Sequence, residues 1–326
     1  MKKTTKTLLG LAGVAAGAAG ATLAVGEALY RFSLTFEGLT FAQSKREKNP
    51  ARMDDLKPTD FSAPLPNWFG EANHTYVHST NCLGEVTTAE CIDDFPDSKR
   101  WVILVHGYTA NPHSMAKYGK VYHEKGFNMI YPCMRGHKNG CDRKISMGWL
   151  DRYDIIGWIY FILHRCPDAQ IVLHGESMGA ATVMMTVGEQ LPANVVCAVE
   201  DCGYTSVYDE FEYQIGELFH LPKFPFLNAG QFMTKVHGGI DFKEASAVDQ
   251  LQKSTTPMLF IHGEADDFVP FEMVFRNYDA FGGEKDIITI PGAAHAESVC
   301  VDPETYWAKV WEFVGKYVDL PEPANA

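Results

Sequence analysis

The sequence predicts an α/β fold, with a mostly parallel central sheet flanked by helices and a small helical cap insertion. Two observations predict it. Short apolar runs alternate with helix-length amphipathic stretches along most of the chain, which is the rhythm of strand–helix–strand units. The 326 residues are also 46% hydrophobic and 12% aromatic, so the chain can bury a large core.

Residues 1–30 have the composition of a hydrophobic anchor or signal segment. Three lysines precede a stretch without charge, residues 8–25, which is rich in Ala and Gly, ends before Glu27, and only just reaches membrane-spanning length. The Ala-Gly-Ala sequence at 19–21 resembles a signal-peptidase site. We interpret the segment as an uncleaved single-pass anchor in the cell membrane, with the main domain outside the cytoplasm. A secreted or a cytoplasmic protein is the alternative, and basic residues between 45 and 52 weaken the anchor interpretation.

Residues 31–67 are polar and punctuated by proline, which predicts a connector to a main domain at 68–326. Within that domain, short apolar runs predict strands at 101–105, 127–131, 171–174, 195–199, 258–262 and 287–290. Apolar residues at three- and four-residue spacing predict helices at about 112–125, 149–165, 178–190, 271–281 and 303–317. The strands are apolar on both faces, as a parallel sheet between two helical layers requires.

The interval 206–246 interrupts this alternation. It has no strand pattern, and large apolar side chains cluster there among prolines: Phe211, Tyr213, Phe219, Leu221, Phe224, Phe226, Phe232 and Met233. We interpret the interval as a helical cap over the functional site. A pair of ordinary surface helices on the body is the alternative.

Charge and cysteine content exclude two classes of partner. The formal charge of −13 repels nucleic acid phosphates, so no nucleic acid is expected to bind. The eight cysteines are scattered, without the C-x-x-C pairs or histidine spacing that form a metal cage. We therefore expect neither a metal site nor a cofactor.

The strongest motif follows the strand predicted at 171–174. This strand runs into a G-x-S-x-G sequence, Gly175 to Gly179, and then into small, helix-compatible residues. Such a turn holds its serine in a strained conformation, and residues larger than glycine at the flanking positions would clash with the backbone. Ser177 is therefore the expected nucleophile. Because Met178 begins the next helix, its N–H is expected to face a developing oxyanion.

A second oxyanion donor is expected in the loop that follows the strand at 101–105. In the strand–turn–helix arrangement that G-x-S-x-G indicates, this loop contributes an N–H group. The strand ends in His106-Gly107, and the N–H of Tyr108 is our candidate. His106 itself is expected to be structural.

A serine nucleophile needs a histidine to take its proton and an acid to orient that histidine. Acids follow the strand at 258–262, and His295 follows the last predicted strand, so the order Ser, Asp, His is one that known triads use. The spacing does not decide between Asp266 and Asp267. Asp201, which follows the strand predicted at 195–199, is a third candidate, but we interpret it as a hydrogen-bonding turn residue.

The chain resembles the α/β-hydrolase superfamily, in its branch of bacterial lipase-like esterases and serine-aminopeptidase-like hydrolases. The resemblance covers about residues 101–318 and rests on motifs at 106–111, 135–137, 147–152, 175–179, 201–206, 262–270 and 292–296. The pattern H-G-x-x-D-x-x-V-P from His262 to Pro270 implies that Asp266 is the acid. One departure is the sequence 138–141, Lys-Asn-Gly-Cys, where the family usually has another glycine, so that side of the pocket is expected to differ.

These residues predict a serine hydrolase that cleaves a carboxylic ester through an acyl-enzyme, with a small ester or a short peptide as substrate. An apolar acyl or alcohol part is expected from the aromatic cap. Peptidase or amidase action is the nearest alternative, in which Glu176 or Asp201 would bind a substrate ammonium. Acyl transfer by the same triad and a binding module without activity are the others.

Overall fold

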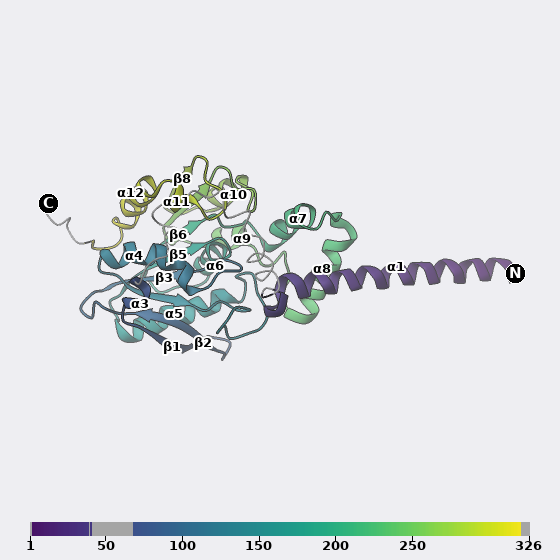
Figure 1. Cartoon of the computed structure of the whole chain (residues 1–326), viewed down its shortest axis with the longest axis horizontal. Coiled ribbons are helices and arrows are strands. Elements are labelled where there is room, and N and C mark those ends of the chain that lie inside the picture. The colour runs from purple at the N-terminus through teal and green to yellow at the C-terminus, as the bar shows by residue number, and fades with distance from the viewer. Residues whose placement is uncertain (1, 39, 41–67, 321–326) are drawn as a thin grey trace.

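The computed structural model describes residues 2–38, 40 and 68–320. Eight strands within these ranges form one sheet, with the order β1-β2-β4-β3-β5-β6-β7-β8 (Figure 1). The strands from β3 to β8 run parallel to one another, whereas β2 is antiparallel to both of its neighbours. The predicted α/β class with a mostly parallel sheet is therefore confirmed.

The six predicted strands are all present, and two more precede them. The bounds are β1 (His74–Thr80), β2 (Val86–Ile92), β3 (Arg100–Val105), β4 (Asn128–Pro132), β5 (Gln170–Glu176), β6 (Val195–Asp201), β7 (Met258–Gly263) and β8 (Lys285–Ile290). β1 and β2 form a hairpin at the edge of the sheet, joined by a turn in which the side-chain oxygen of Asn81 accepts the N–H groups of Leu83 and Glu85. We did not predict this hairpin, because an edge strand that faces water lacks a continuous apolar run.

Helices cover both faces of the sheet, and the strands divide their side chains between two cores. In β3, Ile103 and Val105 belong to one core and Val102 and Leu104 to the other, as the two-residue period of a strand requires. The first core is covered by α5 (Asp151–Arg165), α6 (Met178–Val187), α9 (Ala247–Leu251) and α10 (Glu272–Ala280). The second is covered by α3 (Trp68–Glu71), α4 (Ala116–Glu124), α11 (Ser298–Val301) and α12 (Pro303–Val314), with the short helix η2 (Pro112–Met115) before α4.

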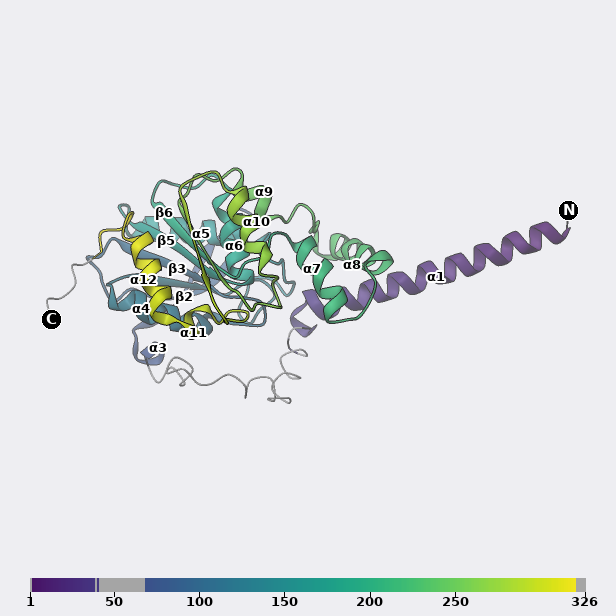
Figure 2. The same ribbon diagram turned by 90° about the horizontal axis from the view of Figure 1, so that it is seen from above.

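Two helices form the cap insertion between β6 and β7, within the predicted interval 206–246. They are α7 (Val207–Glu217) and α8 (Lys223–Gly238). Ser206 begins α7 by accepting the N–H of Asp209 with its side chain, and Gly239 ends α8 with a positive φ of 68°. α1 (Lys2–Leu34) lies along α8 (Figures 1 and 2). Phe211, Phe219 and Phe226 of the cap interval line a pocket together with residues of α1, whereas Phe224 and Phe232 are exposed.

The prediction of a single-pass membrane anchor, with the main domain outside the cytoplasm, is wrong. Among residues 2–38, 40 and 68–320, no helix is long and apolar enough to cross a membrane. The charge at Glu27, which we expected to mark the end of the apolar segment, lies inside α1 and pairs with Arg31 and with His237 of α8. Tyr30 and Leu34 then continue the helix into the core of the protein. Most of the predicted connector, residues 41–67, lies outside the described residues.

Candidate active site

Ser177 lies in the sharp turn between β5 and α6, with φ 58° and ψ −120°. A residue other than glycine rarely adopts a positive φ, so the turn stores strain at this side chain. Both flanking glycines are required by close packing. A Cβ atom at Gly179 would lie 1.9 Å from the carbonyl oxygen of Val105, and one at Gly175 would lie 2.3 Å from the carbonyl oxygen of Gly179.

The turn brings Ser177 against His295, and His295 against Asp266. The hydroxyl of Ser177 lies 2.8 Å from Nε2 of His295. Nδ1 of the same ring lies 2.8 Å from a carboxylate oxygen of Asp266. His295 follows β8 and Asp266 follows β7, so residues from three strand ends meet at the carboxyl edge of the sheet. The alternative acid, Asp267, is exposed.

Both carboxylate oxygens of Asp266 have hydrogen-bond partners. The N–H groups of Phe268 and Val269 both donate to its Oδ1 atom at 2.9 Å, which leaves Oδ2 facing His295. The buried imidazole of His262 also approaches Oδ2, at 3.2 Å. Burial alone would raise the pKa of Asp266, but the hydrogen bonds from His262 and His295 outweigh it and hold this pKa well below its usual value.

This arrangement sets the tautomer of His295. A carboxylate can only accept hydrogen bonds, so Nδ1 carries a proton and Nε2 is left to accept from the hydroxyl of Ser177. The imidazole is further fixed by the ring of Phe268, whose centroid lies 4.9 Å away. The geometry is that of a serine with its base and an orienting acid.

The two N–H groups expected to hold an oxyanion belong to Met178, next to Ser177 in the chain, and to Tyr108 of a neighbouring loop. Met178 begins α6, and the loop of Tyr108 passes so close that a Cβ atom at Gly107 would lie 3.1 Å from Cβ of Ser177. Within the described part of the chain, neither N–H has a hydrogen-bond acceptor. Buried His106 shapes the loop, because its Nε2 accepts from the N–H of Met134 and its Nδ1 therefore donates to the carbonyl of Gly107.

A buried polar network lies next to Ser177. Glu176 forms an ion pair with Lys117 at 2.5 Å and accepts the hydroxyl of Tyr118 at 2.7 Å. The same hydroxyl lies 3.2 Å from Asp201, whose backbone carbonyl accepts the N–H of Ser177 at 2.8 Å. Burial, followed by the charge of Glu176, raises the pKa of Asp201 to about 6. These contacts thus help to fix the turn between β5 and α6 that holds Ser177.

Two groups of side chains among the described residues have the spacing of a metal site. In both groups, the carboxylates already have hydrogen-bond or ion-pair partners within the protein. Cys202 lies with Asp266 and His295, which already bond to each other. Glu85 and Asp154 lie with Cys141, but both carboxylates pair with the buried guanidinium of Arg135. Ion pairs and hydrogen bonds therefore account for both clusters.

The comparisons with known proteins agree with this architecture. A model of the prolyl oligopeptidase family matches residues 163–320. An uncharacterised protein of Bacillus subtilis, YqkD, is 26% identical over 69% of this chain and 74% of its own. The solved structure of the Pyrococcus furiosus esterase Pf2001 covers 81% of this chain and 95% of its own, with 20% identity and a TM-score of 0.60. The chain has the α/β-hydrolase fold.

A second solved structure has the same fold but is named as a peptidase and not as an esterase. The acylaminoacyl peptidase of Pyrococcus horikoshii covers 85% of this chain and 45% of its own, with 16% identity and a TM-score of 0.57. Both esterases and peptidases thus share the fold of this chain. The likeness in fold does not choose between these two reactions.

Three features of this site were missed from the sequence. His262 is a second histidine that contacts the Asp266 carboxylate. It lies four residues before Asp266, but we interpreted it only as part of the motif at 262–270. The pairing of Lys117 with Glu176 and the contact of Phe268 with His295 join residues far apart in the chain. Neither contact has a local sequence signal.

Proposed function

We propose that the protein is a serine hydrolase that cleaves a carboxylic ester through an acyl-enzyme. In this proposal Ser177 is the nucleophile, His295 the general base and Asp266 the acid that orients it. One observation carries the proposal: the two hydrogen bonds of 2.8 Å that join the three side chains in series. The strained φ of Ser177 supports it further, because strain of this kind concentrates at functional sites.

The reaction follows from the positions of the protons. His295 takes the proton of Ser177 as Oγ attacks the ester carbonyl, and the N–H groups of Tyr108 and Met178 stabilise the oxyanion of the tetrahedral intermediate. The imidazolium then returns the proton to the departing alkoxide, which leaves an acyl group on Ser177. Water, deprotonated by His295, releases the acid and restores the serine. Asp266 stays ionised throughout, in keeping with its lowered pKa.

An ester is favoured over a peptide with a free N-terminus by the charges near the site. A peptidase of that kind needs a carboxylate that is free to meet the substrate ammonium. Glu176 is paired with Lys117, and Asp201 is buried beside Tyr118. Both acids are therefore engaged inside the protein, and neither supports recognition of an amine.

The test is turnover of p-nitrophenyl esters against aminoacyl p-nitroanilides, with Ser177→Ala as the matched control. We expect ester turnover that falls by at least about a thousandfold in the variant. Anilide turnover at a comparable rate would replace the esterase assignment with a peptidase. Faster release of p-nitrophenol on adding an alcohol, with an ester of that alcohol as the product, would indicate acyl transfer. Turnover at the wild-type rate in the Ser177→Ala variant would contradict the mechanism.

A further inference from the structure

The last turn of α1 contacts residues 106–111, the oxyanion loop, which is expected to supply one of the two oxyanion donors. The hydroxyl of Tyr108 donates to the backbone carbonyl of Ser33 at 2.8 Å. Ser33 lies one residue before the end of α1, where the carbonyl groups of a helix have no partner within the helix. This hydrogen bond therefore ties a side chain of the oxyanion loop to a helix 75 residues earlier in the chain.

The oxyanion loop is strained at Thr109, whose φ is 63°. A residue other than glycine rarely adopts a positive φ, and backbone of this kind persists only where surrounding contacts hold it. The hydrogen bond across this turn, from the N–H of Ala110 to the carbonyl of Gly107, is long at 3.3 Å. Because Tyr108 directly precedes Thr109, its hydrogen bond to Ser33 is a contact that can hold the turn.

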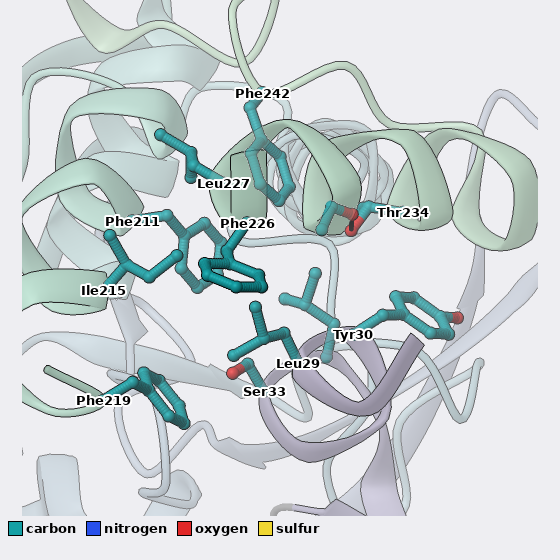
Figure 3. A pocket seen from close by; sticks show the side chains of 12 residues that line it. Leu29, Tyr30, Ser33, Phe211, Ile215, Phe219, Phe226, Leu227, Thr234 and Phe242 are labelled. Carbon is teal, nitrogen blue, oxygen red and sulfur yellow. Dashed lines mark hydrogen bonds between the residues drawn. The ribbon is translucent and has the colours of Figure 1, made fainter. Parts of the chain in front are cut away.

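The position of the Ser33 carbonyl is set by the packing of α1 on the cap. Gly26 of α1 lies so close to α8 that an added Cβ would be 2.6 Å from the carbonyl carbon of Ala229. Leu29, about one turn later, points toward Phe226 of α8 (Figure 3). The acceptor that the oxyanion loop uses thus depends on how α1 lies on α8.

We propose that α1 is a positioning element of the candidate active site. By holding the side chain of Tyr108, its last turn keeps the N–H of that residue aimed at the oxyanion of the tetrahedral intermediate. The inference rests on the proposed ester hydrolysis and adds to it a helix that contains none of the reacting groups. Loss of the hydroxyl, or displacement of α1, leaves the three triad side chains in place and weakens the stabilisation of the oxyanion. The effect is therefore on the transition state and not on substrate binding.

Tyr108→Phe removes the hydrogen bond and keeps the ring. It should lower kcat for an ester about 3- to 10-fold, the range that one neutral hydrogen bond supplies, and change KM by less than about twofold. Tyr204→Phe is the matched control, because Tyr204 is buried and its hydroxyl donates at 3.0 Å to the carbonyl of Met147, which is not part of the oxyanion loop. It should keep the wild-type kcat. A wild-type kcat in Tyr108→Phe would overturn the proposal.

Gly26→Ala displaces α1 without touching the oxyanion loop, because its Cβ would meet the backbone of α8. Gly20→Ala is the matched control on the same helix, since an added Cβ there meets nothing within 4 Å. We expect kcat to fall in Gly26→Ala and not in Gly20→Ala. In a Tyr108→Phe background, Gly26→Ala should lower kcat no further, because the hydrogen bond through which it acts is already gone. Losses that multiply in the double variant would overturn the proposal.

A last readout does not depend on catalysis. Hydrogen exchange of the full-length protein, followed by mass spectrometry of peptides that cover residues 106–111, should be faster in Tyr108→Phe and Gly26→Ala than in the wild type. Tyr204→Phe and Gly20→Ala should leave it unchanged in these peptides. Faster exchange without ester turnover in the wild type would keep the tie between α1 and the oxyanion loop and refute the hydrolase. Ester turnover with unchanged exchange in all four variants would keep the hydrolase and refute the role of α1.

Discussion

The Nε2 atom of His262 lies 3.2 Å from the same carboxylate oxygen of Asp266 that is hydrogen-bonded to His295. It also lies 3.0 Å from the carbonyl of Val269, so Nε2 faces two acceptors and carries the proton. Asp266, the acid of the proposed triad, thus accepts a hydrogen bond from a second imidazole besides that of His295. Removal of that imidazole leaves an ionised carboxylate with one donor fewer in a buried position.

His262→Leu should therefore lower kcat/KM for an ester by about 10- to 100-fold, since a hydrogen bond to a charged group contributes about 1.5–3 kcal/mol. His262→Gln is the matched control, because its amide can donate from nearly the position of Nε2, and it should recover most of the loss. Ester kinetics of both variants would test this. Equal loss in the two variants would show that packing, not the hydrogen bond, is what His262 provides.

Glu210 of α7 should make the protein less stable as the pH rises. Burial raises the pKa of this carboxyl to about 8, with a smaller contribution from the charge of Asp266, while the hydrogen bond from Gln214 opposes the rise. The folded state therefore keeps a proton that the unfolded chain has already released above its usual pKa of about 4.3, so stability falls between that pH and about 8.

Glu210→Gln removes this proton linkage while preserving shape. Urea unfolding at about pH 5 and about pH 8 should show a stability loss that is larger in the wild type than in the variant by a few kcal/mol. The variant should also be the more stable protein at the higher pH. Parallel pH dependence in the two proteins would mean that Glu210 is not the group that titrates.

Removing one partner of the ion pair between Lys117 and Glu176 should lower the stability of the protein. Lys117→Met leaves the Glu176 carboxylate buried without its cation, and we expect the free energy of unfolding to fall by about 3–5 kcal/mol. The added change Glu176→Gln should restore part of the loss. The exposed pair of Lys99 and Asp168 is the control, since Lys99→Met should change stability by less than about 1 kcal/mol.

Gly179 should tolerate no side chain. An alanine Cβ would lie 1.9 Å from the carbonyl oxygen of Val105, so the elbow would have to move and Ser177 with it. We expect Gly179→Ala to remove ester turnover and to lower the midpoint of thermal unfolding. Gly216→Ala, in open space on α7, should leave both unchanged or raise stability by up to about 1 kcal/mol. Normal turnover in Gly179→Ala would contradict the packing argument.

The sequence predicted those parts of the molecule whose physical cause is local. Buried parallel strands need continuous apolar runs, and a tight elbow needs glycines at Gly175 and Gly179, so both leave a pattern in neighbouring residues. The choice of Asp266 over Asp267 came from a motif and not from spacing. Their roles in catalysis stay predictions, although the three side chains lie within hydrogen-bond distance in series.

Contacts between distant segments left no such pattern. An apolar, Ala- and Gly-rich helix suits a lipid environment and a protein surface equally. Contacts in the folded protein, such as the pairing of Glu27 with His237 and the burial of Leu34, show that the end of α1 packs on the rest of the chain. The contact of Tyr108 with Ser33 joins residues 75 positions apart. The β1–β2 hairpin was hidden because its outer strand is largely exposed, as Tyr76 is at 54%.

The most direct test of the central claim is the residue that reacts with a fluorophosphonate probe, identified by peptide mass spectrometry of the labelled full-length protein. We predict one adduct, on Ser177, that forms more slowly by at least about a hundredfold in a His295→Gln variant, because the hydroxyl then has no base. An adduct on a different serine, or labelling of Ser177 at the same rate in both proteins, would contradict the proposed mechanism.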